Sequence, residues 1–186
     1  MRKLGIVAVM FLLLLTVSSC GKNEEMNKST LDVMFLSNIP SNINWKFDSY
    51  LRDILVEGGF EVEDLEINVQ LYPPSHDKLT IEILAKQVDV FIVDESLKLI
   101  LMDPFGLLEL DSILVSSPEL KANPDLYFED EETGKTSLFG VSLTNDSRLL
   151  RDLGLTLQSP LIGVVTKGSP HKEKATHILK ALYEIE

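Results

Sequence analysis

Few side chains in this sequence have the type and spacing that catalysis requires. The chain contains a single cysteine, Cys20, and three histidines, His76, His171 and His177. His171 and His177 are six residues apart, which on a helix places them on roughly opposite faces, so we do not expect them to share a metal ion. One cysteine allows neither an intrachain disulfide nor a zinc site built from several thiolates. We therefore expect no metal centre.

Three further groupings could carry chemistry. Gly134–Thr136 reads Gly-Lys-Thr, but a phosphate-binding loop would also need glycine at position 129, which is Glu129, and we interpret the segment as a hairpin turn. The acidic run Glu129–Glu132 could attract a divalent cation but lacks the alternating carboxylates of a calcium loop. Asp94 and Glu95 could form a paired-carboxylate site, although a helix cap suits them better. We expect no enzyme and no cofactor.

The elements that would position these groups alternate between strand and helix patterns. Apolar or alternating segments predict strands at 31–37, 65–72, 89–94, 138–144 and 161–166. Helical spacing predicts helices at 45–57, 77–87, 95–102, 147–153 and 171–185, with 118–136 irregular. We expect Ser75 and Ser147 to cap helices and Leu79, Ile83 and Leu84 to form the apolar face of 77–87. This order predicts an α/β fold, a single three-layer α-β-α domain with a mostly parallel sheet.

Ligands in open parallel sheets bind beyond the carboxyl ends of the strands. That rule selects polar residues directly after four of the predicted strands, although an ordinary role in a loop or helix cap suits each of them better. Trp45 could stack on a ligand or belong to the core. The candidate ligand-binding residues are Ser37, Asn38, Tyr72, Asp94, Glu95, Thr144 and Asn145.

Cys20 follows a basic start and a short apolar run, Leu4–Leu15, and it ends the tetrad Val-Ser-Ser-Cys. This tetrad resembles the bacterial lipobox, in which the cysteine becomes the first mature residue and carries diacylglycerol. The resemblance implies a signal peptide at 1–19, a tether at 20–30 and a folded domain at 31–186. The same cysteine could also carry an N-acyl chain. An uncleaved transmembrane anchor and a simple secretory signal are the alternatives.

The expected mature chain is strongly acidic. Removal of residues 1–19 takes away Arg2 and Lys3 and no acid, which leaves 15 basic and 29 acidic residues, a formal charge of −14. Such a surface disfavours nucleic acid as a partner.

Three segments, taken in order, resemble extracellular solute-binding proteins, the lipoprotein receptors of ABC importers (the type 2 periplasmic-binding-protein-like group). Leu79–Asp94 is similar to that family's helix and strand, Gly134–Leu143 to its hairpin and strand, and Leu161–Tyr183 to its late strand and returning helix. Only Thr144–Pro160 separates the last two, too little for the family's second lobe. The resemblance therefore implies one lobe with half a cleft.

Two functions follow as expectations. The first is a solute-binding or accessory component of an ABC importer, anchored by lipid on the extracytoplasmic face of the cell membrane, with a small solute and an ABC permease as partners. The second is an interaction lipoprotein that docks another cell-envelope protein and binds no small molecule.

Overall fold

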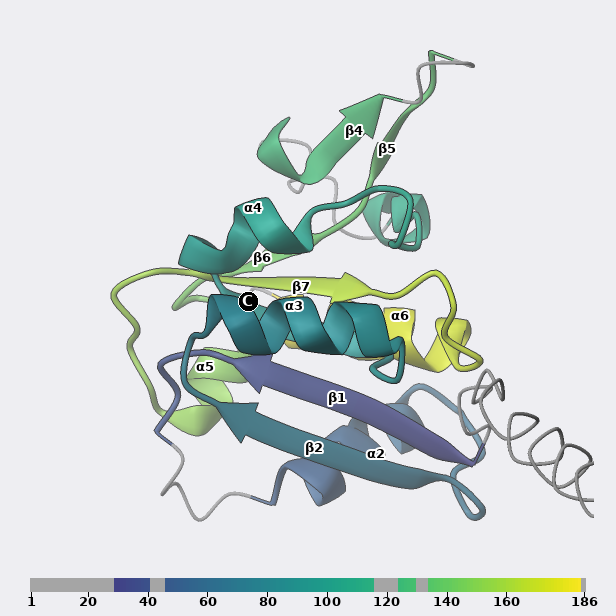
Figure 1. The fold of residues 1–186 in the computed structure, drawn as a ribbon. Helices are drawn as coiled ribbons and strands as arrows, with labels where there is room; N and C mark the ends of the chain where they lie inside the picture. Colours follow the sequence, from purple (N-terminus) through teal and green to yellow (C-terminus); the bar gives the residue numbers. More distant parts are fainter. Residues whose placement is uncertain (1–28, 41–45, 116–123, 130–133, 185–186) are drawn as a thin grey trace, which may run out of the picture.

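A computed structural model describes residues 29–40, 46–115, 124–129 and 134–184. Its main feature is an open five-stranded sheet with the strand order β2-β1-β3-β7-β6, shown in Figure 1. In chain order these strands are β1 (Thr30–Leu36), β2 (Glu66–Tyr72), β3 (Val90–Asp94), β6 (Val141–Leu143) and β7 (Leu161–Val165). The chain therefore has a mixed α/β fold, as the sequence predicts.

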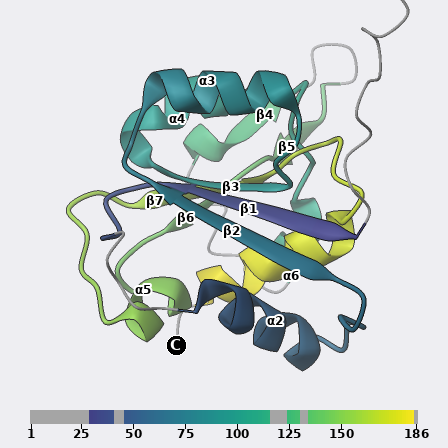
Figure 2. The same ribbon diagram turned by 60° about the horizontal axis from the view of Figure 1, so that its bottom comes forward.

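The first three strands are parallel and are joined by helices. β1 pairs with β2 on one side and with β3 on the other, in both cases parallel. Right-handed crossovers that step in opposite directions along a sheet place their helices on opposite faces. Accordingly, α2 (Phe47–Glu57) and α3 (His76–Ala85) cover opposite faces of the sheet, as Figure 2 shows.

β7 breaks the parallel arrangement, because it is antiparallel to both β3 and β6. The chain leaves β6 through α5 (Arg148–Leu153), whose six residues span only about 9 Å. That length does not carry the chain back to the amino ends of the parallel strands. β7 therefore starts at the edge where β6 and β3 end and runs the other way.

The helices form two groups. α3 and α4 (Lys98–Leu101) contact each other on one face of the sheet, and α2 and α5 each contact α6 (Lys172–Tyr183) on the other face, as Figure 2 shows. A two-stranded antiparallel sheet of β4 (Tyr127–Glu129) and β5 (Thr136–Leu138) lies beside α4 in Figure 1. Short 3₁₀ helices occupy Glu95–Leu97, Asp111–Val115 and Pro124–Leu126.

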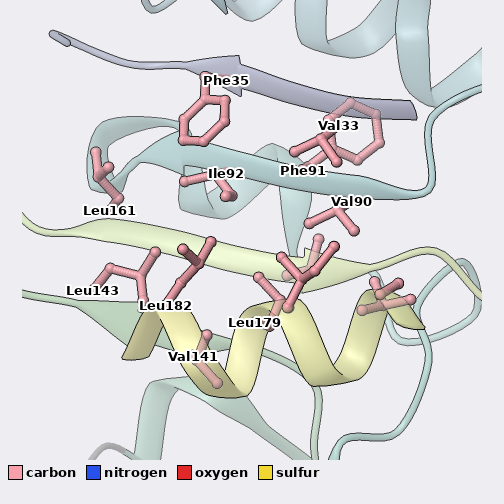
Figure 3. Packing of buried hydrophobic residues seen from close by; sticks show 14 of the residues in the cluster. Val33, Phe35, Val90, Phe91, Ile92, Val141, Leu143, Leu161, Leu179 and Leu182 are labelled. Carbon is pink, nitrogen blue, oxygen red and sulfur yellow. The ribbon is translucent and has the colours of Figure 1, made fainter. Parts of the chain in front are cut away.

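The core lies between the sheet and these helices. Every residue of β3 and β7 is buried, as expected for central strands covered on both faces. Figure 3 shows Leu179 and Leu182 of α6 against the central strands. At Gly163 of β7, an added Cβ would lie 2.8 Å from Leu179 Cδ2, so the glycine lets α6 approach the sheet closely.

Two segments differ from the sequence-based expectation. The strand predicted at 138–144 is divided: β5 pairs with β4, and only Val141–Leu143 joins the main sheet. The division occurs at Phe139 and Gly140, where Phe139 turns its N–H to the Leu126 carbonyl. The region expected to be irregular contains β4 within its described part. Aromatic packing accounts for this hairpin, since the Phe128 and Phe139 rings are 5.8 Å apart.

Two helix details also differ. Leu84 does not belong to the buried face of α3, because it is 74% exposed while Leu79 is fully buried. Ser147 precedes α5 but its hydroxyl donates to the Thr144 carbonyl at 2.6 Å, so it does not cap the helix N–H groups. Ser75 does cap α3, accepting from the Lys78 N–H at 3.2 Å. Trp45 and Cys20 lie outside the described residues.

Candidate functional site

The predicted ligand-binding residues all lie at one edge of the main sheet, which we call the carboxyl edge. β1, β2, β3 and β6 end there, and β7 begins there at Leu161. The pairing of Asp94 with Leu161 brings the end of β3 beside the start of β7. The common strand direction therefore gathers side chains that are far apart in the sequence.

Asp94 is the centre of a hydrogen-bond network at this edge. Its Oδ2 accepts from Asn38 Nδ2 at 2.9 Å and from Ser159 Oγ at 2.7 Å, and its Oδ1 accepts from the Ser96 N–H at 3.0 Å. Burial alone would raise the pKa of the Asp94 carboxyl, but these hydrogen bonds outweigh it and hold the pKa below its ordinary value. The carboxylate thus stays ionised and joins three chain segments.

The contact with Ser96 confirms that Asp94 caps the segment that follows it. Because Asp94 is 5% exposed and both of its oxygens already accept hydrogen bonds, its present geometry offers little to a ligand. Asp94 therefore links neighbouring chain segments by hydrogen bonds and does not act as one half of a reactive carboxylate pair. Glu95 is exposed beside it, and its N–H donates to the Pro160 carbonyl at 3.1 Å.

The two residues after β1 have different environments. Ser37 is buried, its N–H donates to the Tyr72 carbonyl at 3.0 Å, and its hydroxyl oxygen accepts from the Ile39 N–H at 3.4 Å. Asn38 is exposed but uses its amide to reach Asp94. Sequence reasoning placed both correctly at the carboxyl edge, where they stabilise the end of β1.

Tyr72 is the most accessible aromatic group at this edge. The residue is 37% exposed, and its ring lies beneath the Lys78 ammonium, 4.4 Å from the ring centroid. Its hydroxyl donates to Gln70 Oε1 at 3.2 Å. The ring and the cation together form an exposed contact between the end of β2 and the first turn of α3.

Thr144 and Asn145 form a second group, separated from Asp94 by β7. The Asn145 side chain accepts from the Leu157 N–H at 2.9 Å and donates to the Leu157 carbonyl at 3.1 Å. Thr144 accepts from Ser147 through its carbonyl. These contacts fold the 154–160 loop over the edge, so the structure does not bring all seven predicted residues into one site.

An open cavity of about 450 Å³ lies between the start of α3 and the 3₁₀ turn after β3. Its volume is within the range of small-molecule sites. Sequence reasoning missed its lining, which lies two to five positions beyond Tyr72 or Asp94, because it selected the strand ends rather than the first turns of the following helices. The cavity is lined by Pro74, Ser75, His76, Asp77, Ser96 and Leu97.

A second, smaller hollow of about 300 Å³ separates α4 from the β4 hairpin. Lys98 and Asp125 close one side of it with an ion pair at 2.8 Å, and the Asp125 hydrogen bond raises the pKa of the Lys98 ammonium. Leu99, at its margin, is 92% exposed. This hollow is apolar in character and distinct from the cavity at the carboxyl edge.

The other groups singled out in the sequence have structural partners. His171 Nε2 lies 3.0 Å from the Thr30 carbonyl oxygen, and His177 Nε2 lies 3.3 Å from that of Ile54. Lys135 pairs with Glu109 and with Asp111, so its ammonium is already matched by carboxylates. Within the described ranges, no cluster of three or more histidine, cysteine, aspartate or glutamate side chains could hold a metal ion.

None of the helices in the described part of the chain is both long and apolar enough to span a bilayer. Comparisons with protein-family models, with curated proteins and with solved structures found no match.

Proposed function

We propose that this chain is a lipoprotein held by acyl chains on Cys20 at the extracytoplasmic face of the cell membrane. Residues 1–19 would be removed as a signal peptide, 20–30 would form the tether, and 31–186 would form a single three-layer α-β-α domain similar to one lobe of a periplasmic binding protein. The basic start, apolar run and terminal cysteine support the anchor. The placement of helices on both faces of the sheet supports the domain.

The function that this geometry supports best is that of a solute-binding or accessory component of an ABC importer. The observation that carries the proposal is the open cavity of about 450 Å³ at the carboxyl edge. In open α/β sheets, ligands bind beyond the carboxyl ends of the strands, and this cavity lies beyond the ends of β2 and β3. The domain would capture a solute without chemical change.

The lining of the cavity indicates the class of solute. Ser75, His76 and Ser96 offer hydrogen-bonding groups, while Asp77 and the nearby ionised Asp94 disfavour an anion. A small polar solute without net negative charge suits this lining. Because a single lobe leaves the cavity open to solvent, we expect weak affinity in the absence of a second protein.

The second candidate function is an interaction lipoprotein without a small-molecule ligand. Two observations favour it. Asn38, Asp94 and Asn145 already use their polar groups within the chain. Leu99 and Phe105 are 92% and 88% exposed, so each offers an apolar side chain for contact with another protein.

Thermal denaturation of the fragment 22–186 against a panel of sugars, amino acids, peptides and metal ions separates these functions. A ligand that binds only the folded state raises the melting temperature. We expect a shift with an uncharged or cationic polar solute, and we expect Ser96→Phe, which fills the cavity, to remove it. Thr156→Phe, at an exposed position outside the lining, is the matched control.

The importer function would be contradicted by a flat response across the whole panel. A shift that Ser96→Phe leaves intact would place the ligand elsewhere on the domain. Capture of an envelope protein, reduced by Leu99→Ser and unaffected by Ser96→Phe, would favour the second candidate.

A further inference from the structure

The two outer strands of the main sheet, β2 and β6, differ in how they are protected against pairing with a further strand. β6 has only three residues, whereas β2 has seven and pairs with β1 without interruption from Glu66 to Tyr72. Short strands, lysines, prolines and bulges are the usual protection against strand addition. β2 contains no lysine or proline and no bulge, so its outer edge is a long, regular template for pairing, visible as the lower border of the sheet in Figure 1.

The hydrogen bonds at the two ends of β2 fix which of its backbone groups face outward. The Glu66 N–H donates to the Ser29 carbonyl at 2.8 Å, and the Tyr72 carbonyl accepts from the Ser37 N–H at 3.0 Å. In a parallel ladder, alternate residues of a strand direct both backbone groups to the same neighbour. Residues 66, 68, 70 and 72 therefore bond to β1. Ile67, Val69 and Leu71 direct their N–H and C=O outward, where no other strand of the described chain pairs with them.

Only these three residues offer both outward backbone groups for pairing, because the residues at either end of β2 cannot. The Leu65 N–H donates to the Val62 carbonyl, and the Leu65 carbonyl accepts from Arg52 Nη2 at 2.7 Å. At the other end, Pro73 has no N–H to offer. An added antiparallel strand that uses all three outward residues therefore has one register, centred on Val69.

That register is self-complementary. Two copies of β2 related by a twofold axis at Val69 pair Val69 with itself and Ile67 with Leu71, and each pair can exchange both N–H···O bonds. On the other face, Asn68 meets Gln70 of the second copy. Within one chain, Asn68 Nδ2 donates to Asp32 and Gln70 Oε1 accepts from Tyr72. The Gln70 side-chain N–H₂ of one copy can then donate to the Asn68 side-chain oxygen of the other.

The charges at the ends of this pairing are also complementary. Glu66, the only charged residue of β2, faces Tyr72 of the second copy rather than another glutamate. The Lys78 ammonium lies over the Tyr72 ring and pairs with Glu82 at 2.6 Å, so Glu66 of the second copy would share this cation with Glu82 at each end of the pair. For a chain with a formal charge of −12, this is a local exception to general repulsion between copies.

We propose that two copies of this chain associate through antiparallel pairing of β2 with β2 about Val69, which joins their sheets into one continuous sheet. The proposal does not depend on the lipid anchor or on a solute. The pairing would bury more of the half-buried Val69 and Leu71 and would close the longer outer edge of the main sheet in the described part of the chain. The occupant is a second copy because the register and the amide pair are satisfied by the same seven residues of β2, and the charge pair by Glu66 and Lys78.

Sedimentation of the full chain, extracted in a nonionic detergent, tests this association. We expect dimers that dissociate on dilution. Val69→Pro removes the central outward N–H, which pairs with no strand of the described residues, and should weaken the dimer at least about 10-fold. Val69→Thr keeps that N–H and the strand propensity and should leave the dimer intact. Circular dichroism checks that both variants remain folded.

Charge reversal gives an independent readout of the register. Glu66→Lys should weaken the dimer about 5-fold, and addition of Lys78→Glu should restore it. Amide exchange should show protection of Ile67, Val69 and Leu71 that rises with protein concentration. A chain that stays monomeric at every concentration overturns the proposal, as does association that Val69→Pro leaves unchanged. Protection of these amides only when a different protein is added would assign the edge to another occupant and would also overturn it.

Discussion

At the scale of single residues, Asp94 shows how a carboxylate at a strand end can be structural rather than reactive. Three donors from three chain segments meet its two oxygens, and Ser159 reaches it across the gap between β3 and the loop before β7. Hydrogen bonds to an ionised acceptor are stronger than those between neutral groups. The side chain therefore holds together the edge that the proposed cavity adjoins.

Asp94→Asn should lower the free energy of unfolding at neutral pH by about 1–3 kcal/mol, because the Nδ2 group of asparagine cannot accept and would face at least one of the three donors, and the remaining hydrogen bonds would lose their charged acceptor. The pKa of Asp94 in the fold lies below the ordinary value of 3.8, so its contribution is present above pH 3.8 and is lost as the pH falls through the lowered pKa. The difference between wild type and variant should therefore shrink in acid. Urea unfolding from pH 3 to pH 7 measures this.

The matched control is Asp53→Asn at an exposed position of α2, which should leave that pH dependence unchanged. A gap between wild type and Asp94→Asn that stays constant across the range would show that the carboxylate charge does not contribute.

At the scale of elements, the contact between α6 and β7 depends on the absence of a side chain at Gly163. Leu179 is fully buried there and contributes about 1.5–3 kcal/mol through its burial. The side chains of Leu179 and Val141 both lie within 3.3 Å of where a Cβ would stand. Glycine has a low propensity for β-strands, but at this position its missing side chain lets α6 pack closely against β7.

Gly163→Ala should lower the free energy of unfolding by about 1–3 kcal/mol, because Leu179 must leave its rotamer to make room. In a Leu179→Ala background, the same substitution should cost much less, since the nearer obstruction, the Leu179 methyl groups, is gone and only Val141 remains at 3.3 Å. A double-mutant cycle by chemical denaturation measures this coupling. Additive costs in the cycle would show that the cost does not come from the contact between β7 and α6.

The sequence predicted the elements whose pattern is strong and local. β1, β2, β3, β7 and α6 lie where apolar runs or helical spacing placed them, within a few residues. Such patterns could not predict the direction of β7, because that direction depends on the length of the connection from β6 and not on the sequence of the strand itself. The break at Phe139 and Gly140 was also missed, since both halves of that segment are apolar and only their different partners separate them.

The candidate site was predicted in part. The strand-end rule found Asn38 and Asp94, which meet at 2.9 Å, but it also grouped them with Asn145, which lies beyond β7 and binds the 154–160 loop. The rule treats all strand ends as neighbours, whereas an inserted antiparallel strand separates them. The cavity lining belongs to helix starts, whose side chains a strand-based rule does not select.

At the scale of the whole molecule, the proposed membrane anchor, the cavity and the pairing edge of β2 lie at different places on the domain. The described chain begins at Ser29, at the amino end of β1, whereas the cavity lies at the carboxyl edge, at the other end of the strands. A tether entering there would leave the cavity unobstructed. Anchored copies would also share one surface, which raises their effective concentration, so that even a weak pairing of β2 edges would be populated.

Cys20→Ser should release the protein from the membrane fraction, because two acyl chains bury enough methylene groups, at about 0.8 kcal/mol each, to hold a protein that one chain would not. Fractionation of cells and mass spectrometry of the mature amino terminus measure the two parts of this prediction. Lys22→Ser, which keeps the cysteine, should remain bound and lipidated. If Cys20→Ser stays with the membrane and keeps residues 1–19, the apolar run itself is the anchor. The acidic domain would then be held by a peptide segment instead of by lipid, while the pairing of β2 edges would be unaffected.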